Sequence, residues 1–174
     1  MQLHKINDLT NDYVVSLLTC ALENIPEHNL ALNYHPYYKD KAENIFNMLA
    51  NGKFDVGNYY VIEDNGEYAG SAGWYQYNEE VSLVLVRAYI MPKYRTQYLM
   101  ASLILPEIFK ESPSKKLWIT CNDYNKSIYD ALVNMSQGKP AGIFNAWPPI
   151  YAKFKPVGTR LVNNVSQYVA EYER

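Results

Sequence analysis

The chain has 174 residues, enough for one domain with a sizeable core and too few for two comfortable ones. Apolar residues make up 48% and charged residues 20%, which is normal for a soluble globular protein. The formal charge of −2 argues against nucleic acid as a partner, and no apolar run approaches the roughly 20 residues needed to cross a bilayer.

The N-terminal segment is polar and lacks the apolar core of a signal peptide, so we expect a cytoplasmic protein. The two cysteines, Cys20 and Cys121, lie in apolar contexts without CxxC spacing, and we expect reduced, buried thiols. The histidines make no metal-ligand pattern, so the sequence predicts no metal site.

The first part of the chain predicts a strand and two helices. Residues 1–6 read as a short strand. Residues 10–23 and 39–51 carry apolar side chains at helical spacing, and Thr10 or Asn11 can cap the first helix. The segment 25–40 between the helices is polar and holds two prolines, so it reads as a loop.

The pattern then changes to that of strands. Residues 58–91 read as three antiparallel strands in a meander, because turn residues interrupt their apolar runs. The pair Asn65-Gly66 is a strong hairpin signal between two of them. Residues 97–111 predict a helix, in which Pro106 would introduce a kink or shift an end.

In the last part of the chain, predicted strands and a predicted helix alternate. Residues 115–122 predict a buried strand and residues 125–135 a short helix. Residues 136–150 contain three prolines and two glycines and predict a long loop. Residues 154–173 predict two strands around the turn at Asn163-Asn164. This order indicates an α+β layered fold with one central sheet, in a single domain spanning residues 1–174.

Two motifs suggest a family. The segment "IMPKYRTQYLM", residues 90–100, lies between a strand and a helix and resembles the pattern V-x-P-x-[YF]-[RQ]-x-x-G-x-[GA]. Ile90, Pro92, Tyr94 and Arg95 occupy matching positions, whereas the two glycines of the pattern are replaced, at residues 98 and 100, by tyrosine and methionine.

A second segment, "IYAKFKPVGT" at residues 150–159, is similar to the pattern LYxKxGFxxVG with two residues missing before the phenylalanine. Asn125 follows a strand where an asparagine often opens a helix. Together with the order of elements, these motifs resemble the GNAT superfamily of acetyl-CoA-dependent N-acetyltransferases. The resemblance implies a mixed, mostly antiparallel sheet of about seven strands flanked by about four helices.

The resemblance implies acetyl-CoA as cofactor. In the family, backbone N–H groups of the loop bind the pyrophosphate at a helix N-terminus, where helical N–H groups are unpaired. The pantetheine arm pairs with the preceding strand. The positions implied to bind the cofactor are Ile90, Met91, Arg95, Thr96, Gln97, Tyr98, Leu99, Met100 and Asn125.

The absence of glycines leaves two interpretations of this loop open. In the first, Tyr98 and Met100 turn aside and the backbone amides still hold the cofactor, with Arg95 adding a charge-assisted bond. In the second, the segment is a plain connection in which Tyr98 and Met100 help to fill the core.

For catalysis, the resemblance places Tyr151 at the position of the general acid that protonates the leaving thiolate. A phenol with a pKa of about 10 stays protonated at neutral pH and can donate. Tyr129 is the fallback. A base is needed to keep the acceptor amine neutral, and Glu80 is the candidate, weighed against Glu79 and Asp123 as solvated turn residues.

The acceptor is expected to be the primary amine of a small molecule or a protein. The family forms its acceptor pocket partly from the loop between the first two helices, which here carries Tyr34, His35 and Tyr37. Members of the family often dimerise, so a homodimer is one expectation, and no membrane partner is expected. The alternative function is a catalytically inactive GNAT-fold module that serves in binding or in structure.

Overall fold

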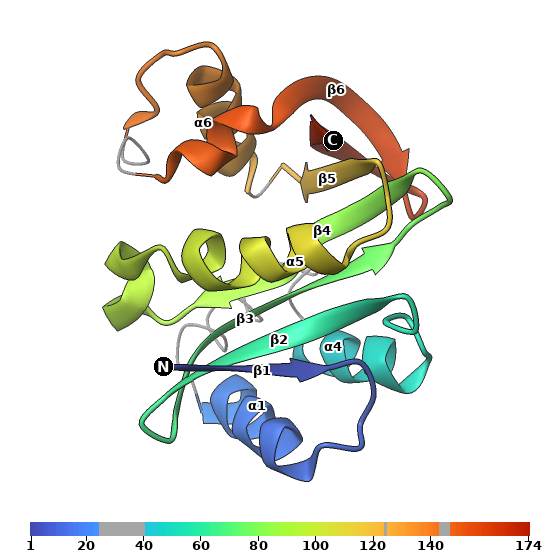
Figure 1. Cartoon of the computed structure of the whole chain (residues 1–174), viewed down its shortest axis with the longest axis vertical. Helices are drawn as coiled ribbons and strands as arrows, with labels where there is room; N and C mark the ends of the chain where they lie inside the picture. Colours follow the sequence, from blue (N-terminus) through green and yellow to red (C-terminus); the bar gives the residue numbers. More distant parts are fainter. Residues whose placement is uncertain (25–40, 124, 143–146) are drawn as a thin grey trace. The chain divides into compact units, whose positions relative to one another are not determined.

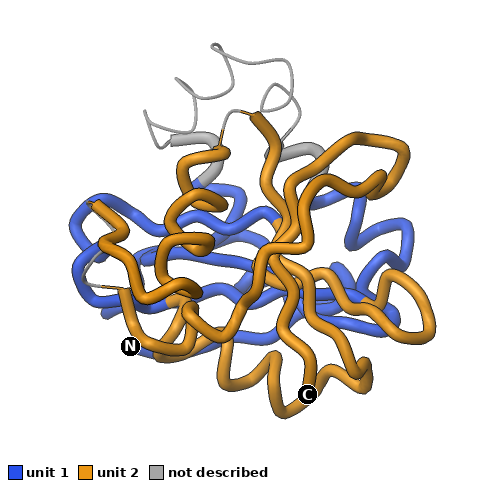
Figure 2. Tube along the Cα trace, turned by 90° about the horizontal axis from the view of Figure 1, so that it is seen from above, with its two compact units in different colours: residues 1–75, 87–99 blue, residues 76–86, 100–174 orange. Residues whose placement is uncertain are grey.

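The computed structural model describes residues 1–24, 41–123, 125–142 and 147–174. The chain divides into two compact units (Figure 2). The first comprises Met1–Tyr75 and Arg87–Leu99, and the second comprises Gln76–Val86 and Met100–Arg174. Among the described helices, none is long and apolar enough to cross a membrane. The single-domain organisation stays a prediction.

A seven-stranded sheet has the order β1-β2-β3-β4-β5-β7-β6 (Figure 1). Strand β4 contributes to both units, because the boundary between them falls between residues 86 and 87. β4 and β5 run parallel, and the pairs β1–β2, β2–β3, β5–β7 and β6–β7 are antiparallel. The predicted mixed, mostly antiparallel sheet is therefore confirmed. The strands are β1 (Gln2–Ile6), β2 (Gly57–Asp64), β3 (Glu67–Gln76), β4 (Val81–Ile90), β5 (Lys116–Cys121), β6 (Lys155–Val162) and β7 (Val165–Glu173).

In the first unit, strands β1 to β3 are accompanied by helices α1 (Asp12–Asn24) and α4 (Lys41–Ala50), close to the predicted ranges. The side-chain oxygen of Asn11 accepts a hydrogen bond from the Val14 N–H at 3.1 Å, which confirms the expected cap. The β2–β3 hairpin turns at Asn65 and Gly66, both with positive φ, as a two-residue turn of this kind requires.

The predicted helix over residues 97–111 is wrong in its first half. The chain instead forms a 3-10 turn, η1 (Pro92–Gln97), then a π turn, η2 (Met100–Ile104), and only then helix α5 (Leu105–Glu111). Pro106 lies in the first turn of α5. Proline has no N–H to donate and is tolerated there, so it sets the start of the regular helix, and the expected shift of a helix end is confirmed.

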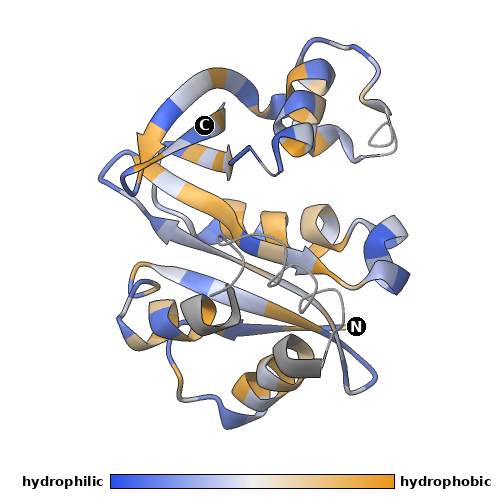
Figure 3. Ribbon diagram, turned by 180° about the vertical axis from the view of Figure 1, so that it is seen from behind, coloured by the Kyte–Doolittle hydropathy of each residue, from blue (hydrophilic) through white to orange (hydrophobic). Residues whose placement is uncertain are grey.

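The second unit contains β5, β6 and β7 with helix α6 (Lys126–Ser136) and the 3-10 turn η4 (Pro149–Lys153). Each α-helix shows both apolar and polar colours in Figure 3, as amphipathic helices do. Cys121 is buried, and burial raises the pKa of its thiol to about 12. Cys20 is exposed on α1, so the expectation that both thiols are buried is wrong for Cys20.

Candidate functional site

Strand β4 is irregular before it reaches the first motif. Leu85 has φ 55° and Arg87 has φ 52°, a left-handed conformation that is uncommon for residues other than glycine. Such residues interrupt the regular strand and redirect its backbone groups. The backbone that leads into residues 90–100 is therefore set by two local distortions.

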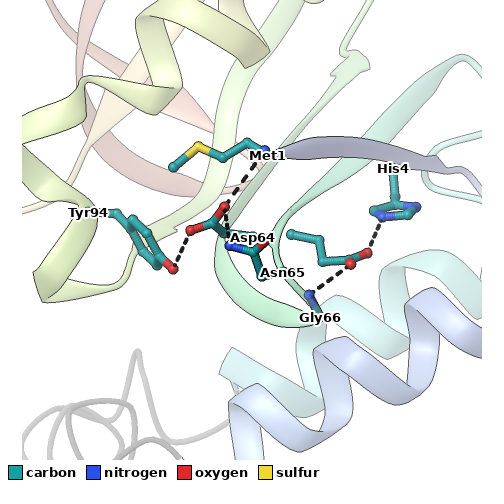
Figure 4. A network of polar contacts seen from close by, with 7 residues as sticks. Met1, His4, Asp64, Asn65, Gly66 and Tyr94 are labelled. Carbon is teal, nitrogen blue, oxygen red and sulfur yellow. Dashed lines mark hydrogen bonds and ion pairs between the residues drawn. The ribbon is translucent and has the colours of Figure 1, made fainter.

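The turn η1 is held by side chains of the β2–β3 hairpin. Tyr94, buried at 6% exposure, donates a hydrogen bond from its hydroxyl to Asp64 Oδ2 at 3.0 Å (Figure 4). Its neighbour Lys93 forms an ion pair with Glu67. The Tyr94 N–H also donates to the Met91 carbonyl at 2.9 Å. The tyrosine of the motif is thus the buried anchor of the turn.

The other carboxylate of this hairpin shapes the turn itself. Glu63 Oε1 accepts a bond from the Gly66 N–H at 3.1 Å, and Glu63 Oε2 lies 2.6 Å from His4 Nε2 on β1 (Figure 4). The hydrogen bond from His4 and, after it, that from Gly66 lower the pKa of Glu63 against the opposing effect of burial. Glu63 therefore joins β1, β2 and the turn, and so supports the strand end from which Asp64 holds Tyr94.

Tyr98 adopts the backbone conformation that a glycine would supply. Its φ and ψ are 53° and 36°, in the left-handed region, at the position of the first family glycine. A non-glycine residue pays about 1 kcal/mol for this conformation. Tyr98 and Met100 are both half-buried, whereas Leu99 is buried at 4% exposure. At Tyr98 the loop therefore has the backbone conformation that glycine favours, and Tyr94 and Leu99 are its buried residues.

Arg95 lies over one edge of β4. Its Nε donates to the Ile90 carbonyl at 3.1 Å, and its side chain is exposed. The Met91 N–H donates to Ala69 of β3, so by alternation along the strand the Ile90 N–H and carbonyl point away from β3. Among the described residues, the guanidinium of Arg95 makes no further hydrogen bond, and it lies over the Tyr89 ring with its Cζ 5.8 Å from the ring centre. Its remaining N–H groups are available to an anion, and Thr96 and Gln97 beside it are exposed.

In the second unit, the turn after β5 is closed by two asparagines. The Asn122 N–H donates to Asn125 Oδ1 at 2.7 Å, and the Asn125 N–H donates to Asn122 Oδ1 at 3.1 Å. Asn125 is also the residue immediately before α6. Its side-chain oxygen is used within the turn, and within the described part of the chain its amino group has no partner. Asn125 can therefore offer its amino group to a ligand as a donor.

Tyr151 lies in η4, which packs against α6. Its side chain is buried at 8% exposure and contacts Trp147, with ring centres 4.8 Å apart and the rings tilted by 41°. Burial raises the pKa of the Tyr151 phenol. The hydroxyl therefore keeps its proton at neutral pH, which is the state that a general acid needs.

The two other residues considered for catalysis lie at opposite ends of β5. Glu80 is exposed, and its carbonyl accepts a bond from the Lys116 N–H at the start of β5. At about 3.3 Å per residue, β5 spans about 16 Å from there to its end, where α6 begins. The ring of Tyr129 on α6 contacts that of Tyr168 in a tilted arrangement, and the Tyr168 hydroxyl donates to Asp123 at 3.1 Å. Within this unit, Asn125 and Tyr151 thus lie on neighbouring elements and Glu80 does not.

The predicted acceptor residues Tyr34, His35 and Tyr37 lie outside the described residues. Sequence reasoning also missed two residues that support the loop, Asp64 and Glu67. The Asn65-Gly66 signal located their hairpin, but no local pattern links that hairpin to a loop some 30 residues further along the chain.

The fold can be compared with that of known proteins. No family model and no curated protein matches the sequence. Solved structures do match over nearly the whole chain. Escherichia coli ElaA is 13% identical with a TM-score of 0.57, and covers 99% of this chain and 100% of its own. An aminoglycoside 6'-acetyltransferase type Ii is 14% identical with a TM-score of 0.59, covering 99% and 97%.

A third structure is the PaiA N-acetyltransferase from Thermoplasma acidophilum in complex with coenzyme A. It is 13% identical with a TM-score of 0.58, and the match covers 100% of both chains. Together with a putative acetyltransferase described as a GNAT family member, which matches with a TM-score of 0.58 at 14% identity, these structures show that the chain has the GNAT fold. The fold predicted from the two motifs and the order of elements is confirmed.

Proposed function

We propose that the protein binds acetyl-CoA and transfers its acetyl group to a primary amine. The observation that carries this proposal is the left-handed backbone of Tyr98. A bulky residue is held there in the conformation that glycine provides in a pyrophosphate loop, next to an exposed arginine with unpaired N–H groups. Acetyltransferases with the same fold, one of them in complex with coenzyme A, support the same activity.

The residues proposed to hold the cofactor are on the end of β4 and on the loop that follows. Arg95 would bind a phosphate with its terminal guanidinium N–H groups, because only its Nε is bonded to the Ile90 carbonyl. Backbone N–H groups of Thr96 to Met100 would contribute further donors. The free edge of β4 at Ile90 would pair with the pantetheine arm, whereas the Met91 N–H is already bonded to Ala69 of β3. The Asn125 amino group is the donor proposed in the second unit.

Acetyl-CoA supplies an acyl carbon activated as a thioester, whose C–S bond breaks when the amine nitrogen bonds to that carbon. The role proposed for Tyr151 is to hold a proton on its phenolic oxygen and pass it to the departing sulfur. Glu80 lies at the opposite end of β5 from Asn125 and Tyr151, beyond the reach of one bridging water, so it is not assigned the role of base and the amine proton is proposed to leave to solvent water. Tyr34, His35 and Tyr37 are proposed to contact the acceptor.

Binding can be tested by titrating acetyl-CoA in a thermal unfolding experiment, with acetate as the control ligand. A ligand at 1,000 times its Kd stabilises the folded state by about 4 kcal/mol. For a chain of this size that raises the Tm by about 8–16 °C. No shift at millimolar acetyl-CoA would refute the proposal and leave the alternative, a GNAT-fold module without catalysis.

The proton donor can be tested with Tyr151→Phe, which keeps the ring against Trp147 and removes the hydroxyl. Turnover would be followed as thiol released from acetyl-CoA in the presence of a panel of primary amines. General acids contribute about 100-fold or more, so we expect turnover to fall by that factor with acetyl-CoA affinity unchanged. The control is Tyr129→Phe. Loss of turnover in the control alone would assign the proton to Tyr129.

A further inference from the structure

A chain of three hydroxyl groups runs through the core of the first unit to strand β4. Tyr68 and Ser71 of β3 lie 2.7 Å apart through their oxygens, and Ser71 lies 2.9 Å from the hydroxyl of Tyr59 on β2. The Tyr59 hydroxyl donates to the carbonyl of Arg87 on β4 at 3.1 Å. We call these three side chains the hydroxyl relay. All are buried, with exposures of 0% for Tyr59, 1% for Ser71 and 7% for Tyr68.

The direction of every hydrogen bond in the relay follows from its last acceptor, the Arg87 carbonyl oxygen. A carbonyl oxygen only accepts, so Tyr59 must give its single proton to Arg87. Ser71 must then donate to Tyr59, which leaves Tyr68 to donate to Ser71. Burial raises the pKa of both tyrosines, so each has the proton that this arrangement uses. The relay therefore has one fixed orientation that ends on the backbone of β4.

Tyr59 reaches β4 only because β3 lacks a side chain at one position. β3 lies between β2 and β4, and Tyr59 pairs with Gly73 in the β2–β3 register. A Cβ atom on Gly73 would lie 2.6 Å from Tyr59 Cδ2, closer than such atoms approach. The absence of a side chain at Gly73 thus lets the Tyr59 ring lie across β3. A tyrosine on β2 could be buried without crossing β3, so burial alone does not explain this arrangement.

The hydrogen bond from Tyr59 reaches β4 at a residue whose backbone conformation is unfavourable. Arg87 has φ 52°, a conformation that persists in a residue with a side chain only when its surroundings hold it. The hydroxyl of Tyr59 would in turn be costly to bury without a partner. One bond satisfies both requirements. Only three residues separate Arg87 from Met91, so the conformation at Arg87 sets the course of the strand end.

We propose that the hydroxyl relay is a positioning device, which holds the distorted backbone at Arg87 so that the free edge of β4 at Ile90 is presented to the pantetheine arm of acetyl-CoA. The identity of the ligand, acetyl-CoA, rests on the proposed function. The statement that the relay holds the β4 backbone does not. Tyr59 would be a positioning residue, since it acts through the β4 backbone and does not touch the cofactor.

The test compares Tyr59→Phe with Tyr60→Phe. Tyr60 is the neighbouring residue on β2, is equally buried, and accepts a bond from Trp74 Nε1 at 3.1 Å. Both variants remove one buried phenolic hydroxyl, but only the first removes the bond to β4. Each would be measured for amide hydrogen exchange at Tyr89 to Met91 without ligand and for the Kd of acetyl-CoA.

For Tyr59→Phe we expect about fivefold faster exchange at these amides and about a fivefold higher Kd, the effect of losing one hydrogen bond. For Tyr60→Phe we expect a lower Tm with the Kd of the unmodified protein. If the two variants show equal exchange at β4 and equal Kd, the hydroxyls are merely structural and the proposal is overturned.

A second variant, Ser71→Ala, keeps the test open if Tyr59→Phe does not fold. It removes the middle hydroxyl and leaves the Tyr59 ring in place, so we expect a smaller change of the same kind. An unmodified protein that does not bind acetyl-CoA would overturn the proposed function. The exchange comparison would still decide by itself whether the relay holds β4.

Discussion

The turn after β4 and the turn after β5 both lead from a strand into helical structure, yet they are held in different ways. The first has a left-handed tyrosine and is anchored by Tyr94 and Lys93 to a hairpin about 30 residues earlier. The second is closed by the reciprocal bonds of Asn122 and Asn125, with one bond from the distant Tyr168 to Asp123 at its exposed side. A turn built from residues that favour it is closed mainly by its own bonds, whereas one that departs from local preferences is held by buried distant contacts.

Of the substitutions that test this difference between the two turns, Tyr94→Ala should have the largest effect. Removing a buried aromatic ring and its bond to Asp64 should lower the free energy of unfolding by about 3 kcal/mol. Urea denaturation measures this. The control, Tyr94→Phe, keeps the ring and should lose only about 1 kcal/mol for the hydrogen bond. Wild-type stability in both variants would show that the hairpin does not anchor the turn.

The exposed arginine of the first turn should affect binding rather than stability. Arg95→Ala removes a charge-assisted donor worth about 1.5 kcal/mol, so the Kd of acetyl-CoA should rise about tenfold. Isothermal calorimetry checks this, with an unchanged urea midpoint as the second expectation. Arg160→Ala, on the exposed part of β6, is the matched control and should leave the Kd unchanged. Equal Kd values in all three proteins would exclude Arg95 from the phosphate site.

Substitutions in the turn after β5 should have smaller effects on stability than the loss of the Tyr94 anchor. Asn125→Ala and Asn122→Ala should each lower the free energy of unfolding by about 1 kcal/mol, the usual net loss for one hydrogen bond. Because the two side chains complete one turn, the double variant should lose about 0.5 kcal/mol less than the sum. A double-mutant cycle in urea measures this coupling. Full additivity would show that the two bonds do not act together.

The smallest effect concerns pH and the hairpin that supports the first turn. The pKa of Glu63 is lowered in the folded state, chiefly by the bond from His4, so its stabilisation is present above its ordinary pKa of 4.5. It is lost as the pH falls through the lower folded value. Glu63→Gln should therefore be less stable than the unmodified protein at pH 6, and the difference should shrink at pH 3.

Urea midpoints at the two pH values would measure this difference. Glu79→Gln, in the exposed turn before β4, is the control and should show no such dependence. A difference for Glu63→Gln that stays the same at pH 6 and pH 3 would contradict the role assigned to this carboxylate.

Sequence reasoning succeeded where a signal is local. The helices around residues 12–24, 41–50 and 126–136, and the hairpins at Asn65-Gly66 and Asn163-Asn164, followed from spacing and turn residues. It was wrong for residues 97–104, where a helical apolar pattern becomes a 3-10 turn and a π turn. There, helical spacing competes with the left-handed residue Tyr98 and with Pro106, and the tertiary contacts of Tyr94 decide the outcome.

The sequence by itself determined the order of elements, the GNAT fold and the position of the candidate loop, because periodicity, turn residues and motif register are properties of neighbouring residues. Only the tertiary structure decided how the loop without glycines is maintained. The left-handed conformations of Tyr98 and Arg87 run against local preference. Side chains far away in the chain bond close to both: Asp64 accepts a bond from Tyr94, four residues before Tyr98, and Tyr59 donates to the Arg87 carbonyl. No local pattern records such pairs.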